Sequence, residues 1–145
     1  LDEAYTDGLT IKARPFNTYD GRIKNKNIYL RTSLSNIEKS CVLAEELGHY
    51  YTTVGNILDQ SKDENRKQEY HARMWGYDRC IGLQGIIKAY KSNLTDIDEM
   101  ADFFNVTPQY LSEAIECYHK KYGICTTVDN HIIYFEPCLA VMEII

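Results

Sequence analysis

The feature that most constrains this chain is a long, uninterrupted helical stretch that contains the segment Glu45–His49, with the sequence EELGH. Ser35 followed by Glu38 is a capping box, in which each side chain satisfies a free backbone amide at a helix start. No proline interrupts residues 37–54, and Gly55 stands where a glycine commonly ends a helix. The sequence therefore predicts one helix over residues 37–54.

Within this helix, Glu45 and His49 are four residues apart, so their side chains lie on one face. In the H-E-x-x-H motif of many zinc sites, two histidines at this spacing bind the ion, and the glutamate after the first is the general base. Here Glu45 stands at the first ligand position and Glu46 at the position of the base. Because a carboxylate oxygen is an accepted zinc ligand, we expect a metal site. The alternative is an ordinary amphipathic helix with two solvated glutamates and a hydrogen-bonded histidine.

Two neighbours of this pair carry further information. Gly48 costs the helix about 1 kcal/mol relative to alanine, and a glycine beside a candidate ligand indicates close approach of another backbone or of a substrate. Cys41 can touch a metal as a thiolate, but a small buried hydrophobic residue is the simpler interpretation. The face with Val42, Leu43 and Leu47 is expected in the core.

A third ligand is expected from the next helix, which begins in a polar segment and continues in an apolar run over residues 67–91. Its Glu69 would complete, with Glu45 and His49, a three-ligand site with an open fourth position, the pattern of catalytic zinc. His71 is the alternative third ligand. It cannot bind together with Glu69, because a helix does not point two residues that are two positions apart at the same atom. Two carboxylates and one imidazole leave the ion less positive than two imidazoles and one carboxylate.

The remaining segments predict a small α+β fold in one domain, residues 1–145. Residues 1–6 suit the end of a helix, residues 9–16 and 28–32 suit short strands, and a polar, turn-rich segment separates the two strands. The expected parts are a metal-site core over residues 1–91, a helix-turn-helix-like segment over residues 92–123 and C-terminal strands over residues 124–145, with a hairpin formed by residues 125–128 and 132–135.

The helix-turn-helix-like segment consists of a short acidic helix over residues 96–104, a turn, and a second helix that starts with Thr107 as N-cap and Pro108 in the first turn. A helix that reads DNA carries basic or amide side chains near its start. This helix carries Glu113 and Glu116, which would repel phosphates. We therefore interpret it as scaffold or as a protein-docking surface.

Charge and composition agree with a single soluble domain and argue against a nucleic-acid-binding protein. The net charge of −5 argues against general nucleic-acid binding, which needs a concentrated basic surface. Arg22, Lys24 and Lys26 do cluster, but intervening asparagines favour a solvated turn. No apolar run approaches the length of a membrane span. The five scattered cysteines indicate reduced thiols and therefore a cytoplasmic location. No membrane or nucleic-acid partner is expected.

Three segments together resemble a known family: Leu43–Tyr51 (LAEELGHYY), Glu69 followed by Ala72, and Tyr118–Gly123 (YHKKYG). They are similar to the ImmA/IrrE-type metallo-endopeptidases, which are gluzincin-like enzymes encoded largely by bacteria, phages and integrative elements. The resemblance covers nearly the whole chain. It implies a compact zincin-like α+β domain that uses Zn²⁺ to cleave a partner protein, a transcriptional repressor of a mobile genetic element.

By position, the resemblance makes Glu46 the catalytic glutamate, His49 the second histidine ligand and Glu69 the downstream acidic ligand. Glu45 replaces the first histidine of the family pattern. Two functions are therefore open: a zinc peptidase that uses these residues, or a relative with little or no activity that acts as an anti-repressor by binding its target. A tyrosine near the metal would be suited to stabilise an oxyanion, but most of the twelve tyrosines are expected to be packing residues.

Overall fold

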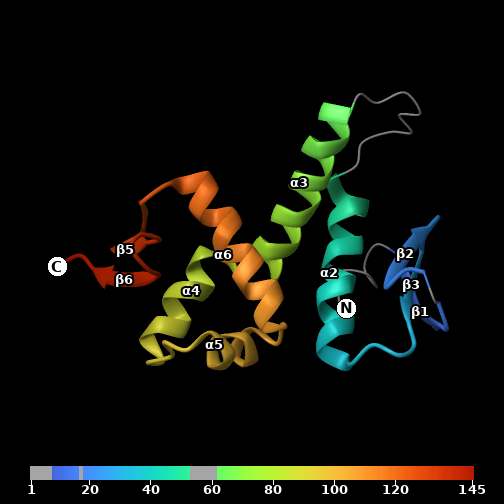
Figure 1. The fold of residues 1–145 in the computed structure, drawn as a ribbon, viewed down its shortest axis with the longest axis horizontal. Coiled ribbons are helices and arrows are strands. Elements are labelled where there is room, and N and C mark those ends of the chain that lie inside the picture. The colour runs from blue at the N-terminus through green and yellow to red at the C-terminus, as the bar shows by residue number, and fades with distance from the viewer. Residues whose placement is uncertain (1–7, 17, 53–61) are drawn as a thin grey trace. The chain divides into compact units, whose positions relative to one another are not determined.

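The computed structural model describes residues 8–16, 18–52 and 62–145 of the chain. Helices α2–α6 and two three-stranded sheets make up the described residues, which confirms the predicted α+β class (Figure 1). The chain divides into two compact units, Leu1–Gly76 and Tyr77–Ile145. Among the described residues, no helix combines the length and the apolar character that crossing a membrane requires.

The N-terminal unit contains a mixed sheet in which the central strand is the last in sequence. Its strands are β1 (Thr10–Arg14), β2 (Gly21–Lys24) and β3 (Asn27–Arg31), in the order β1-β3-β2. Strand β3 runs parallel to β1 and antiparallel to β2. Ile28 and Leu30 alternate along β3 and are both buried, so one face of the sheet joins the core.

Strand β2 corrects the sequence interpretation, which assigned residues 17–27 to a polar turn-rich segment. β2 and β3 form a hairpin with a two-residue turn, in which Asn25 adopts a left-handed conformation with a φ of 56°. Only Ile23 of β2 packs against the core. An edge strand with a single apolar contact lacks the apolar alternation by which strands are usually predicted.

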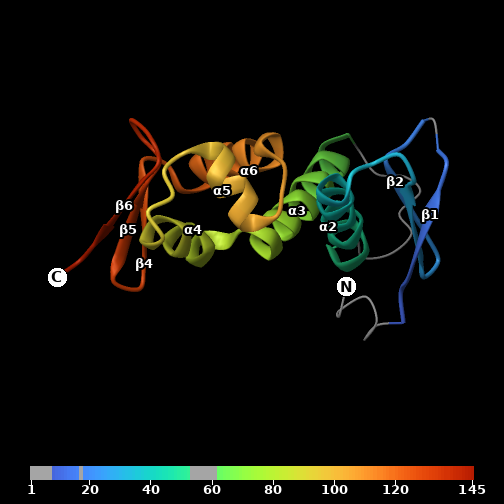
Figure 2. The same cartoon turned by 90° about the horizontal axis from the view of Figure 1, so that it is seen from below.

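Helix α2 (Asn36–Thr52) lies between the N-terminal sheet and α3 (Lys62–Cys80) (Figures 1 and 2). Its predicted capping box is confirmed: the Glu38 amide donates to Ser35 Oγ, and the Ser35 amide donates to a Glu38 carboxylate oxygen, each at 3.1 Å. Leu47 joins the buried core of the sheet, and Val42 and Leu43 pack around it. The predicted helix end at Gly55 and the predicted helix over residues 1–6 lie outside the described residues.

The second predicted helix is in fact two helices. α3 ends at Cys80 and α4 (Gly82–Lys91) follows, whereas the sequence predicted one helix to residue 91. Gly82 has a φ of +67°, a left-handed conformation that interrupts the helix and that glycine adopts without steric cost. The apolar periodicity continues through the break and therefore concealed it.

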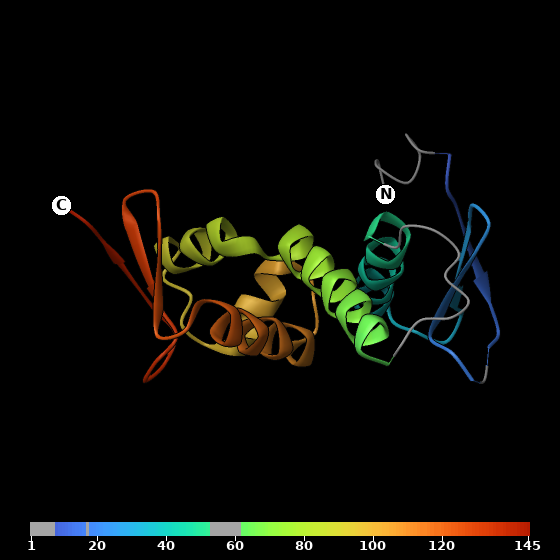
Figure 3. The ribbon, with the colours of Figure 1, turned by 90° about the horizontal axis from the view of Figure 1, so that it is seen from above.

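The C-terminal unit contains the predicted helix pair and strands. In α5 (Ile97–Phe104) and α6 (Pro108–Tyr122), the turn and the cap follow the prediction, since Thr107 Oγ1 accepts from the Tyr110 amide at 3.1 Å. Strands β4 (Cys125–Val128), β5 (His131–Tyr134) and β6 (Ala140–Glu143) form an antiparallel sheet in that order. Figure 3 shows this sheet beside α4 and α6. Tyr118 and Leu111 of α6 are fully buried.

Candidate metal centre

The crossing of α2 and α3 at Gly48 determines which side chains meet. A Cβ atom at Gly48 would lie 2.2 Å from the carbonyl oxygen of Ala72 on α3, so the two backbones approach as closely as glycine allows. Ala72 itself is fully buried. This contact is the close backbone approach that the sequence predicted for Gly48, and it places the residues beside it on the two helices near one another.

Three of those residues converge: Glu45 and His49 from α2, and Glu69 from α3. Each offers one ligand atom, and the three atoms all lie within 4.8 Å of one another. His49 Nε2 and Glu69 Oε2 are 3.6 Å apart. Glu45 is exposed and the His49 side chain is 27% exposed, so the group is open to solvent on one side. The structure therefore brings together the three candidate ligands predicted from sequence.

The geometry and chemistry of this group fit a divalent metal ion. Ligand atoms in a tetrahedral zinc site lie about 3.3 Å apart, because each is about 2.0–2.2 Å from the ion. The 3.6 Å separation of His49 and Glu69 is close to that value. The charges of Glu45, Glu69 and His49 all act on the Glu46 carboxyl, so three carboxylates lie near a single imidazole. A cation relieves the repulsion among them.

The two alternative ligands lie elsewhere. His71, the other candidate for third ligand, is exposed and meets the ring of Tyr70 edge to face at 5.7 Å between centroids. It does not belong to the described group of converging ligand atoms. Cys41 is buried, in agreement with its interpretation as a small hydrophobic residue. The geometry thus favours Glu69 as the third ligand.

Glu46 occupies a different environment from Glu45. Its side chain is half-buried beside the edge strand β2, where a Cβ atom at Gly21 would lie 3.3 Å from Glu46 Cγ and 2.5 Å from Val42 Cγ1. Burial raises the pKa of the Glu46 carboxyl, and the charges of Glu45 and Glu69 raise it further, while His49 opposes them. A carboxylate with a raised pKa is a stronger base.

Gly21 was not singled out from the sequence. Its lack of a side chain lets β2 pack closely against Val42 and Glu46 of α2, and the only sequence signal is a glycine that follows Asp20 in a polar segment. A methyl group at position 21 would clash with Val42 and would also lie tightly against the side chain of Glu46, the candidate base.

The two tyrosines that follow His49 pack against other aromatic rings. Tyr51 stacks on Trp75 with ring centroids 5.2 Å apart, and Tyr50 meets Tyr51 edge to face. Tyr118, in the C-terminal unit, is buried, and its hydroxyl donates to Asp78 at 2.8 Å. Burial and the Asp78 charge raise the pKa of the Tyr118 phenol. These contacts agree with the prediction that most tyrosines serve packing.

Comparison with known proteins gives one finding. The model of the peptidase M78 family, described as the IrrE N-terminal-like domain, matches residues 5–116. That range includes every candidate ligand and Glu46. No curated protein and no solved structure matches the chain significantly.

Proposed function

Because the chain belongs to the peptidase M78 family of IrrE N-terminal-like domains, a metallopeptidase family, we propose that it is a zinc-dependent endopeptidase. The ligands are Glu45, His49 and Glu69, and Glu46 is the general base. One observation carries the assignment: side chains from two helices present three suitable ligand atoms within 4.8 Å. The donor set of one imidazole and two carboxylates is compatible with zinc.

In this proposal, the metal ligands hold the ion and Glu46 transfers the proton. A bound zinc ion supplies Lewis acidity for the scissile carbonyl and for the attacking water. The Glu46 carboxylate accepts a proton from that water at one of its oxygens and later gives it to the nitrogen of the leaving amine. The environment of Glu46 supports this role, because its raised pKa lets the carboxyl hold the proton between the two transfers.

The substrate that the ImmA/IrrE resemblance supports is a transcriptional repressor of a mobile genetic element, and the corresponding place of action is the cytoplasm. A second candidate function follows from Glu45, which stands where the family pattern has a histidine. If this position weakens metal binding, the chain acts by binding its target without cleavage. The two functions differ in bound metal and in turnover, so both can be measured directly.

The first test is metal analysis of protein purified without added zinc. We expect about one zinc ion per chain, and loss of nearly all of it in His49→Ala. His71→Ala is the matched control, because it removes an exposed histidine from α3 that lies outside the converging group. Full zinc retention in His49→Ala would refute the assignment.

The second test is turnover on a library of peptides prepared from a bacterial proteome, with products identified by mass spectrometry. Products that form with the wild-type protein and are absent with Glu46→Gln show endopeptidase activity at this site. Normal zinc content together with no product from any peptide would favour the binding function.

A further inference from the structure

The outer face of the N-terminal sheet, turned away from α2, is basic. Side chains alternate along a strand, so the burial of Ile28 and Leu30 places Tyr29 on the opposite face. The register pairs Tyr29 with Lys12 on one side and with Arg22 on the other, and these three side chains therefore share that face. The three strands contain no aspartate or glutamate.

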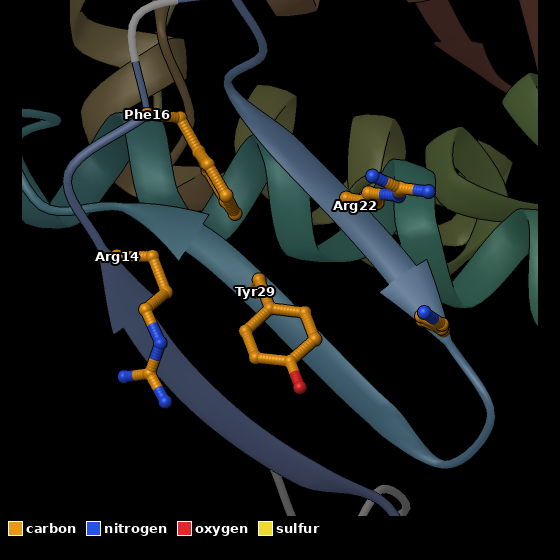
Figure 4. A pocket seen from close by; sticks show the side chains of 5 residues that line it. Arg14, Phe16, Arg22 and Tyr29 are labelled. Carbon is orange, nitrogen blue, oxygen red and sulfur yellow. The ribbon is translucent and has the colours of Figure 1, made fainter.

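A hollow of about 310 Å³ lies on this face and is lined by Arg14, Phe16, Arg22, Lys24 and Tyr29. Figure 4 shows Tyr29 on β3 in the middle, with its ring turned outward, Arg14 from β1 on one side and Arg22 from β2 on the other. Phe16 stands at one end, where its ring meets that of Tyr29 edge to face at 6.4 Å and 81°. The hollow thus has a flat aromatic floor, an aromatic wall and cations on two sides.

No carboxylate of the described residues pairs with the cations that line this hollow. The carboxylate of Asp20 forms an ion pair with Arg31. Within the described residues, Arg14, Arg22 and Lys24 have no ion pair with any carboxylate. Three like charges on one small surface repel one another, so an anion bound among them is favoured by each.

The combination of groups selects the class of anion. Cations alone attract an acidic peptide as well as a phosphate, but an outward-facing aromatic ring between cations also stacks on a planar base. Arginine binds phosphate oxygens with two parallel hydrogen bonds. The Arg14 guanidinium carbon lies over the Tyr29 ring, 5.5 Å from its centroid, so a base that stacks on this ring would contact Arg14 or move it aside, and the guanidinium stays within reach of the phosphate.

We propose that this hollow binds a nucleotide, with its base stacked on Tyr29 and its phosphate held by Arg14, Arg22 and Lys24. The volume of about 310 Å³ lies at the lower end of small-molecule sites and suits one nucleotide. That unit is either a free nucleotide or one position of a single-stranded nucleic acid, since both present the same chemistry.

A nucleotide site departs from the expectation, drawn from the net charge of −5, that nucleic acid is not a partner. Net charge averages over the chain, whereas the three strands of this sheet carry only basic charges. The proposed site is independent of the metal centre, because no candidate ligand or base belongs to it.

The binding test uses the full chain and a fluorescein-labelled ten-residue deoxyadenosine strand, followed by fluorescence anisotropy at low salt. Competitors are adenosine monophosphate, adenosine, inorganic phosphate and a ten-residue glutamate peptide. We expect the strand to bind and the affinity to fall as salt is raised. Displacement by adenosine monophosphate identifies a free nucleotide as sufficient, and its failure to displace identifies the single strand as the source.

Variants separate stacking from charge. Tyr29→Leu should weaken binding about 5- to 100-fold, the range for loss of one stacked base, and the double variant Arg22→Glu, Lys24→Glu should weaken it by at least about 10-fold. Matched controls are Tyr90→Leu and the double variant Lys88→Glu, Lys91→Glu, which alter exposed residues of α4 and should bind normally. Circular dichroism of each variant tests that the fold is retained.

Three results would overturn the nucleotide site. The first is absence of strand binding by the wild-type chain at low salt. The second is displacement by the glutamate peptide or by inorganic phosphate as effective as that by adenosine monophosphate, because the base would then contribute nothing. The third is unchanged affinity in a folded Tyr29→Leu variant. Arg22→Gln, Lys24→Gln replaces the charge-reversal variant if that variant does not fold.

Discussion

Substitution of Gly48 by alanine would test whether the contact between α2 and α3 sets the metal geometry. The added Cβ would lie 2.2 Å from the carbonyl oxygen of Ala72 and 3.0 Å from its carbonyl carbon, while ordinary contacts begin at 3.4 Å. The opposing atoms belong to a backbone and cannot rotate away. The helices must therefore separate by about 1.2 Å at this point.

This displacement acts on the ligands directly. His49 follows Gly48 on α2, and Glu69 lies about one turn before Ala72 on α3. A metal site tolerates changes of only about 0.2 Å in its ligand distances, so a shift of about 1.2 Å removes Glu69 from its position. We expect zinc affinity to fall by at least about 10- to 100-fold, the range for residues that orient ligands.

The effect on stability should be smaller. Overpacking costs about 1–3 kcal/mol, while replacement of a helical glycine by alanine returns about 1 kcal/mol. The expected net loss is about 0–2 kcal/mol in the metal-free protein. Gly48→Ala therefore weakens metal binding while the chain still folds, a combination that simple unfolding does not produce.

Zinc affinity is measured by competition with a chromophoric chelator, and stability by urea unfolding in the presence of a strong chelator. Gly85→Ala is the matched control, because the nearest atoms to its Cβ all belong to the Phe104 ring, with Cε1 at 2.9 Å, and a side chain can move. That variant should bind zinc normally. Wild-type zinc affinity in Gly48→Ala would refute the view that this crossing positions the ligands.

Three further predictions concern α2. Glu46→Gln should retain zinc and lose cleavage by about 10²–10⁴-fold, the contribution of general acid–base catalysis; loss of zinc as well would make Glu46 a ligand. Glu45→His should bind zinc more tightly and cleave at least as fast at neutral pH, whereas equal affinity in a titration would refute the ligand role of Glu45. Hydrogen bonds from Ser35 lower the pKa of Glu38, so this carboxylate stabilises the fold above its ordinary pKa and loses that effect as pH falls through its folded pKa. In urea unfolding, Glu38→Gln should abolish this acid-dependent loss, and an unchanged pH profile would count against it.

Much of the metal centre is local in sequence and was therefore predictable. The capping box, the helix and the pair Glu45 and His49 all follow from the spacing of residues within α2, because spacing within one helix determines which side chains share a face. Glu69 was proposed through its place in the family pattern, and helix geometry showed only that Glu69 and His71 cannot both point at one atom; the choice between them stayed open in the sequence. The convergence of Glu69 with Glu45 and His49 depends in addition on the packing of α3 against α2 at Gly48, which spacing within one helix does not determine.

The elements that were missed depend on contacts distant in sequence. Ile23 is the only residue of β2 that packs against the core, and the strand is otherwise held in the sheet by its pairing with β3. The break between α3 and α4 depends on the left-handed conformation of Gly82, and a single glycine among apolar residues does not predict that conformation. The basic hollow combines β1, β2 and β3, and only the register reveals that Lys12, Tyr29 and Arg22 are neighbours.

Glu45 links the two halves of the proposed chemistry. As a ligand, its negative charge makes the ion less positive than a histidine would, which weakens the acidity of the attacking water. In the metal-free chain, the same charge adds to burial in raising the pKa of Glu46, and a carboxylate with a higher pKa is a stronger base. If Glu45 is a ligand, we expect the exchange of histidine for glutamate at this position to weaken the acidity of the attacking water and to strengthen Glu46 as a base. Glu45→Gln separates the two effects, because it removes the negative charge that acts on Glu46 but leaves an oxygen donor for the ion. On the acidic side of the pH profile, the pH at which cleavage reaches half its maximum should then move downward. An unmoved profile would show that Glu45 does not act on Glu46.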